Sequence, residues 1–172
     1  MPLPRFPVDV VMERVPIASR WASEKWQPAA VLPAGAPALG LEVREGEVSC
    51  LVDGPEGSQW RFPGFALELH RSEAEGYYLN VTAPQPRVFV LWRRFEDASP
   101  EARPVLVTVS YNEAARMIDG GEQVDAVAMP VPVRDWLAPF VAEHYKPEPK
   151  KKVRRNDPFA GDPGRDPRRR GL

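Results

Sequence analysis

The sequence has few of the residues on which many enzymes and metal centres rely. Among its 172 residues there are two histidines and a single cysteine, Cys50. One cysteine excludes an intrachain disulfide and any zinc or iron–sulfur site built from cysteines of this chain. The glycines never fall into the phosphate-binding spacings G-x-x-x-x-G-K-S/T or G-x-G-x-x-G. We therefore expect no cofactor and no resident metal.

Long apolar runs and a secretion signal are also missing. No stretch of about 18 consecutive apolar residues occurs, which argues against a membrane span. The first residues, MPLPRFPVDV, are interrupted by three prolines and by Arg5 and Asp9, whereas a signal peptide needs a continuous apolar region. Together with the lone cysteine, these features predict a cytoplasmic protein.

Charge is plentiful but unevenly distributed. Residues 146–172 contain ten Lys/Arg and four Asp/Glu, whereas residues 1–145 contain 13 and 20. The basic segment is rich in proline and poor in large apolar side chains, so it cannot bury enough surface to offset the entropy of ordering. We predict one β-rich globular domain at 1–145 that ends in helices, followed by a disordered basic tail at 146–172.

The tail cations form a candidate polyanion-binding site. Its members are Lys150, Lys151, Lys152, Arg154, Arg155, Arg168, Arg169 and Arg170. The partner would be nucleic acid, an acidic protein or an anionic membrane surface. A tail that only solubilises the protein, or folds back on its acidic body, explains the same charges.

Segments typical of β-strands dominate the first 110 residues. Such runs occupy residues 8–14, 26–32, 60–70, 76–82, 87–94 and 104–110. The runs at 76–82 and 87–94 flank the short link APQP, which predicts a β-hairpin. Residues 88–92 are apolar on both alternating faces, so this strand should be central in its sheet. The pattern does not fix the strand register between Pro33 and Gln59.

The pattern changes to helical spacing after residue 110. Ser110 and Glu113 fit a capping box at the start of a short helix over residues 111–119. Apolar residues from Val133 to Tyr145 predict an amphipathic C-terminal helix, which Pro139 should kink or delay. The predicted fold is mainly β with C-terminal α: a small antiparallel barrel or sandwich, covered by a short helix and by the C-terminal amphipathic helix.

Few side chains suggest catalytic chemistry. Glu68 and His70 share a strand face and could form an acid–base or metal-binding pair, although a solvated face explains them more simply. Cys50 is expected to be a small buried apolar residue rather than a nucleophile. Ser110 is expected to be a helix cap rather than a nucleophile.

Three tryptophans are candidate protein-binding residues: Trp21, Trp26 and Trp136. Trp26 opens an apolar strand, so we expect it to anchor the core. Trp21 lies in the polar connection before that strand. It could plug one end of the fold, or it could stay exposed and serve as a binding hot spot.

Three segments together resemble a known family. They are VMERVPIASRWASEKWQPAAVLP, EGYYLNVTAPQPRVFVLWRR, and PVLVTVSYNEAARMIDGGEQVDAVAMP with FVAEHYKPEPKKKVRR. The chain is similar over most of Val8 to Arg155 to an uncharacterised family of small bacterial proteins, domain of unknown function 3305 (DUF3305). Members are found beside formate dehydrogenase genes, with molybdenum-enzyme chaperones and iron–sulfur proteins. The resemblance implies an accessory or assembly role and supplies no catalytic or binding residues.

Three hypotheses follow, the first from this resemblance together with the missing catalytic residues and the other two from the sequence itself. The first is a non-enzymatic accessory protein of a molybdenum-dependent formate dehydrogenase system, whose subunits or maturation factors would be its partners. The second is a nucleic-acid or ribosome-associated protein that acts through its basic tail. The third is an enzyme that brings His70 close to acids distant in the sequence.

Overall fold

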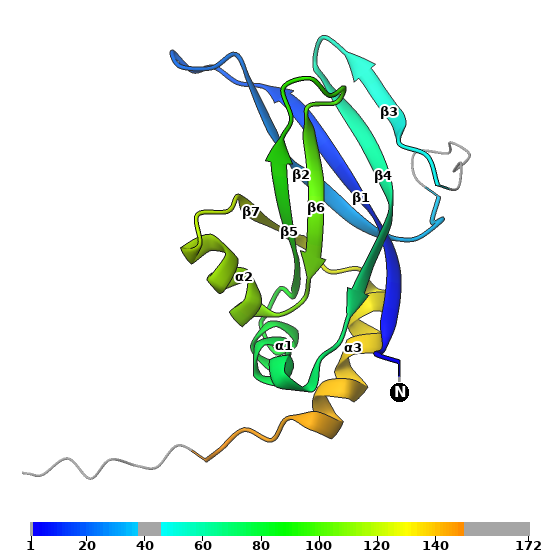
Figure 1. Cartoon of the computed structure of the whole chain (residues 1–172), viewed down its shortest axis with the longest axis vertical. Helices are drawn as coiled ribbons and strands as arrows, with labels where there is room; N and C mark the ends of the chain where they lie inside the picture. Colours follow the sequence, from blue (N-terminus) through cyan, green and yellow to red (C-terminus); the bar gives the residue numbers. More distant parts are fainter. Residues whose placement is uncertain (1, 38–45, 150–172) are drawn as a thin grey trace, which may run out of the picture.

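The computed structural model describes residues 2–37 and 46–149 and contains two antiparallel sheets (Figure 1). The seven strands of the described chain are β1 (Arg5–Pro16), β2 (Glu24–Pro33), β3 (Ser49–Gly54), β4 (Gly57–Glu68), β5 (Arg87–Arg94), β6 (Ala102–Thr108) and β7 (Val124–Ala128). One sheet has the order β2-β1-β4-β3 and the other the order β6-β5-β7. The central position predicted for residues 87–94 is therefore confirmed.

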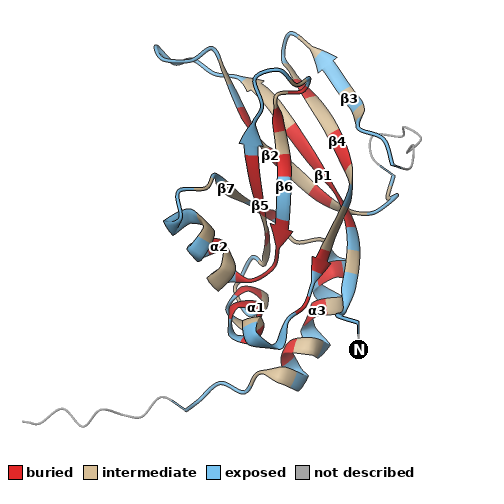
Figure 2. Cartoon of the chain, in the orientation of Figure 1, coloured by how far each residue is buried: buried red, intermediate tan, exposed pale blue. Residues whose placement is uncertain are grey.

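The two sheets form a sandwich, one of the two predicted architectures. They contact each other where β2 meets β7 and where β4 meets β6, without pairing into one closed sheet. Alternate residues of the strands point into the space between the sheets, and Figure 2 shows these buried positions in red. Those from β1, β4 and β5 are Val8, Val10, Met12, Phe62, Leu67, Val88, Val90 and Trp92. Burial of these apolar side chains is the main stabilising term of the fold.

The helical elements are η1 (Arg71–Glu73), α1 (Ala74–Val81), α2 (Tyr111–Asp119) and α3 (Val131–His144). Helices α1 and α3 pack together at one end of the sandwich (Figure 1). Aromatic pairs fix this contact, since Tyr77 meets Phe140 and Tyr78 meets Tyr145 at ring-centre distances of 5.9 and 4.7 Å. No helix in the described part of the chain has the length and apolarity needed to cross a bilayer.

The hairpin predicted for residues 76–94 was wrong, because residues 76–81 belong to α1. Asn80 explains why this β-prone run is helical. Its side-chain amide donates to the carbonyl oxygens of Arg87 and Val109 at 2.7 and 2.9 Å, and its side-chain oxygen accepts from the Arg87 amide at 2.8 Å. These bonds of the buried Asn80 side chain join the helix to β5 and to the residue that follows β6, and they outweigh the weak local preference for a strand.

The start of α2 is capped as predicted, with one difference. The Ser110 hydroxyl accepts from the Glu113 amide at 3.1 Å. The Glu113 carboxylate does not return to the Ser110 amide. It accepts instead from the Thr108 hydroxyl at 2.8 Å, and that same hydroxyl accepts from the Ser110 amide at 3.0 Å. The Thr108 side chain thus links Glu113 to the Ser110 amide and completes the capping box.

Helix α3 also begins where proline allows it. Pro132 lies in its first turn, where a missing amide costs nothing. Pro139 neither ends the helix nor delays its start, because the helix runs from Val131 through to His144. Val133, Leu137 and Val141 form its buried stripe.

Tyr77 gives the fold a testable pH dependence. The side chain is 1% exposed, and burial raises the pKa of Tyr77 to about 12. The unfolded chain ionises near pH 10, so the stability contribution is complete below pH 10 and is lost as the pH rises toward 12. We expect the free energy of unfolding to fall by up to about 1.4 kcal/mol per pH unit in this window.

The Tyr77→Phe variant should lose this part of the pH dependence, and Tyr111→Phe, at an exposed tyrosine, should keep it. At neutral pH, Tyr77→Phe should cost about 1 kcal/mol, because the hydroxyl donates to the Glu68 carbonyl and accepts from the His70 amide. Urea unfolding at pH 8, 10 and 11 measures both effects. Equal alkaline slopes for wild type and Tyr77→Phe would contradict the assignment.

Candidate functional site

Three strand connections lie at the end of the sandwich opposite α1 and α3, and the β1–β2 connection projects to one side of the other two (Figure 1). They are the β1–β2 connection at 17–23, the β3–β4 turn at 55–56 and the β5–β6 connection at 95–101. We call this region the loop end. The loops are far apart in the sequence and lie at the same end because β1, β4 and β5 all have an end here.

Arg14 links the strands at the loop end. It lies in β1, opposite Trp26 of β2 and Ser58 of β4. Its guanidinium pairs with Glu24 at 3.0 Å and donates to the Ser58 hydroxyl at 3.2 Å. Both groups stay partly exposed, so the ion pair itself adds little stability. Together, the two contacts hold the Arg14 guanidinium beside the β3–β4 turn.

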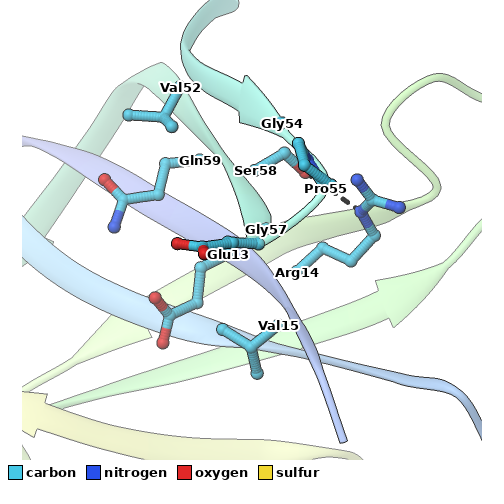
Figure 3. A pocket seen from close by; sticks show the side chains of 10 residues that line it. Glu13, Arg14, Val15, Val52, Gly54, Pro55, Gly57, Ser58 and Gln59 are labelled. Atoms are coloured by element: carbon cyan, nitrogen blue, oxygen red, sulfur yellow. Dashed lines mark hydrogen bonds between the residues drawn. The ribbon is translucent and has the colours of Figure 1, made fainter.

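Three hollows surround Arg14, and this residue lines all of them. Their volumes are about 510, 160 and 310 Å³. The largest lies between the end of β1 and the β3–β4 turn, where Figure 3 shows Glu13, Val15, Val52 and Gln59 around it. It therefore combines apolar side chains with carboxylate and amide groups.

The lining is negatively charged. The described residues that line the three hollows include five carboxylates and one cation, Arg14; the carboxylates are Glu13, Glu24, Asp53, Glu56 and Glu101. Among these lining residues there is no histidine, cysteine or lysine. Such a surface attracts cationic groups rather than phosphates or other anions.

Gly57 shapes the turn beside the largest hollow. Its φ is +134°, and a Cβ at this position would lie 2.6 Å from the Arg14 carbonyl oxygen. Only glycine allows β4 to start this close to the backbone of β1. The stretch DGPEG at 53–57 is rich in turn-forming residues, and it forms the tight connection between β3 and β4.

The β5–β6 connection is tied down on two sides. The Phe95 amide donates to the Glu101 carbonyl oxygen at 2.8 Å, which closes the loop. The Glu101 carboxylate accepts from the indole nitrogen of Trp26 at 2.9 Å. Trp26 is buried in the core, as predicted, and its polar edge anchors this loop.

The three predicted tryptophans do not come together. Trp21 lies in the β1–β2 connection and is 93% exposed, whereas Trp26 is buried. Trp136 is half-buried in α3 and packs on Phe6 at a ring-centre distance of 5.4 Å. Of the three, Trp21 alone presents a large free apolar surface. The predicted tail cations, from Lys150 onward, lie outside the described residues.

The structure also shows where the Glu68–His70 pair and Cys50 lie. His70 and Glu68 are exposed at the end of β4, and their backbones, not their side chains, bond the Tyr77 hydroxyl. The burial expected for Cys50 was wrong, because the residue is exposed on the edge strand β3. Two effects raise the pKa of the Cys50 thiol: partial desolvation, which is the larger, and the nearby negative charge of Asp53. Both effects disfavour the nucleophilic thiolate.

Sequence reasoning missed Arg14, Ser58 and Glu101. Each is an ordinary polar residue in its own segment, and its role depends on contacts across 10 to 75 positions of sequence. Of the residues at this end of the molecule, the sequence singled out Trp21 and Trp26.

Comparison with known proteins places the chain in a family. A family model described as protein of unknown function (DUF3305) matches residues 7–154. The chain belongs to the DUF3305 family. No curated protein and no solved structure matches it. The DUF3305 match begins within β1 and covers the other strands and all helices of the described chain, so the loop end lies within the matched region.

Proposed function

We propose that this DUF3305 protein is a non-enzymatic accessory protein that binds another protein through its loop end. The family resemblance supplies the identity we propose for the partner: a subunit or a maturation factor of a molybdenum-dependent formate dehydrogenase. The structural support concerns the binding surface and is independent of that identity.

The exposed side chain of Trp21 carries the proposal. A tryptophan buries more apolar surface than almost any other side chain, and it is enriched among residues that dominate binding energy. Here it stands on a connection closed at its base, where the Ile17 amide donates to the Ser23 carbonyl oxygen at 3.1 Å. Phe95 on the β5–β6 connection and Val52 near the end of β3 add exposed apolar surface at the loop end.

Charge indicates what the partner presents. The carboxylates around the hollows would pair with lysines or arginines on the partner, while Trp21 would enter an apolar pocket. This combination of an apolar anchor with a charged rim is typical of transient protein–protein interfaces.

Co-purification from a native host tests the proposal. Tagged full-length protein should enrich formate dehydrogenase subunits or their maturation factors, and Trp21→Ala should weaken capture about 30-fold, as expected for a hot spot worth about 2 kcal/mol. Because Trp21 makes no core contact, its loss should change stability by less than about 0.5 kcal/mol. Ile118→Ala, at an exposed apolar residue on α2, is the matched control and should capture normally.

The basic tail offers a second proposal, binding to nucleic acid, and the same preparation tests it. A full-length variant with the eight tail cations replaced by serine should keep the protein partners if the loop end binds them. If RNA or DNA co-purifies instead, is lost in this variant and dissociates steeply with salt, then the tail carries the function and the loop-end proposal fails.

A further inference from the structure

A second feature, away from the loop end, is a slot between the edges of β4 and β6. It is a hollow of about 350 Å³, lined on one side by residues 64–66 with Glu68 and His70 and on the other by residues 105–108 with Glu113. Within the described residues, β4 pairs with β3 only as far as Arg61, and β6 pairs with β5 alone. Two strand edges without a described pairing partner therefore face each other across the slot.

Both strands have a β-bulge at the end of the slot that is nearer the loop end. In β4, Pro63 and Gly64 oppose Asp9 alone, and the φ of Gly64 is +89°. In β6, Val105 is the extra residue between two pairs formed with β5. A bulge bends its strand and increases the local twist. On the loop-end side of the bulges the two strands are in contact, because the Arg103 guanidinium of β6 lies 5.6 Å from the centre of the Phe62 ring of β4.

The direction of the two strands defines what can fill the slot. Figure 1 shows the arrowheads of β4 and β6 pointing the same way. One added strand running the opposite way would pair antiparallel with both at once. Its amide and carbonyl groups would satisfy both free edges, which neither a helix nor a small molecule can do. Peptide binding by strand addition uses this chemistry.

The lining side chains define the peptide further. Val105 and Leu106 are exposed, and Phe65 is half-buried, so apolar groups are available on the floor and the rim. The charged groups that face the slot are the carboxylates of Glu68 and Glu113, and no lysine or arginine is among the described residues that line it. A peptide with alternating β-branched residues and at least one lysine or arginine complements this surface.

We propose that the slot binds an extended segment of another protein as an added strand between β4 and β6, joining the two sheets along this side. The segment is β-prone and carries a positive charge. This inference does not depend on the loop end, which lies at the other end of these strands from the helices.

The test uses the full-length protein and a defined probe. The probe is a fluorescent seven-residue peptide, Lys-Val-Thr-Val-Lys-Val-Thr, followed by fluorescence anisotropy. We expect saturable binding, with amide chemical-shift changes concentrated at residues 65–68 and 106–108. The same peptide with N-methylated valines loses the backbone donors of one strand edge, so it can no longer pair with both β4 and β6 and should bind at least about tenfold more weakly. Equal binding of the two peptides would overturn the proposal.

Substitutions locate the site and separate it from the loop end. Glu68→Lys should weaken the peptide about tenfold or more, because it places like charges together. Glu96→Lys, an exposed charge reversal on the β5–β6 connection, and Trp21→Ala should bind the peptide as wild type does. Weakening by Glu96→Lys without weakening by Glu68→Lys would assign binding to the loop end and overturn the slot.

Two further outcomes would assign the slot to a different occupant. If replacing Lys150, Lys151 and Lys152 with serine tightens peptide binding about tenfold, the protein's own tail occupies the slot. If the free protein forms dimers that Glu68→Lys dissociates, a second copy occupies it. Either result overturns the proposal of a separate partner, and unchanged binding by a monomer supports it.

Discussion

Asp9→Ala is expected to lower the free energy of unfolding by about 3–5 kcal/mol, the largest effect of any single substitution proposed for this protein. Asp9 and Arg61 are each 2% exposed, and they form an ion pair of 2.8 Å between β1 and β4. Asp9 also accepts from the Gly35 amide at 3.3 Å. Removing the carboxylate leaves a buried guanidinium without a counter-charge.

Arg61 makes this loss severe. Both terminal nitrogens of its guanidinium are buried and have no hydrogen-bond partner within the described residues. The Asp9 carboxylate therefore satisfies the one nitrogen that is paired there, Nε. Without it, the full desolvation penalty of the cation remains.

The paired replacement is the control. Asp9→Leu with Arg61→Met removes both charges, so it should be far less destabilising than Asp9→Ala and within about 1 kcal/mol of wild type or above it. Urea unfolding of the three proteins measures this directly. A loss of less than about 1 kcal/mol for Asp9→Ala would show that water reaches Arg61 and would contradict its burial.

Gly76→Ala should destabilise the protein by about 2 kcal/mol, although alanine is the better helix former by about 1 kcal/mol. A Cβ on Gly76 would lie 2.3 Å from the Ser110 hydroxyl oxygen and 3.1 Å from the Asn112 amide nitrogen. Ser110 cannot move away, because its hydroxyl caps α2 and also donates to Glu73 at 2.5 Å. Overpacking and partial loss of the cap both oppose the gain in helix propensity.

A double-mutant cycle isolates this contact. Ser110→Ala removes the clashing oxygen and costs about 1 kcal/mol through the lost cap. In that background, Gly76→Ala should cost at least about 1 kcal/mol less than it does in the wild type. Gly120→Ala is a milder control, since its Cβ would approach nothing closer than 3.4 Å. Additive effects of Gly76→Ala and Ser110→Ala would contradict the packing of α1 on α2.

Prediction from the sequence succeeded where the signal was local and failed where contacts with distant residues decided the structure. Runs of residues typical of β-strands correctly predicted β1, β2, β4, β5 and β6, because strand composition and period are local signals. The Ser110 cap was correct for the same reason. Helix α1 was wrong because Gly76, Tyr77 and Asn80 are fixed by partners elsewhere in the chain, so its local β preference was overruled.

The candidate site was predictable only in part. Trp21 could be singled out because a large apolar residue in a polar connection is unusual. Strand β7 was missed because VDAVA is short and follows two glycines. The hollows around Arg14 and the slot beside β6 depend on which strand edges meet in space, and no periodicity within a segment reports that.

Site-specific photo-crosslinking at position 21 tests the central claim most directly. A benzophenone amino acid replaces Trp21 in the full-length protein of a native host, and the same group at Ile118 on α2 serves as the control. We predict adducts at position 21 that contain a formate dehydrogenase subunit or maturation factor, and none of these adducts at position 118. No adduct at position 21, or the same adducts at both positions, would contradict binding through the loop end.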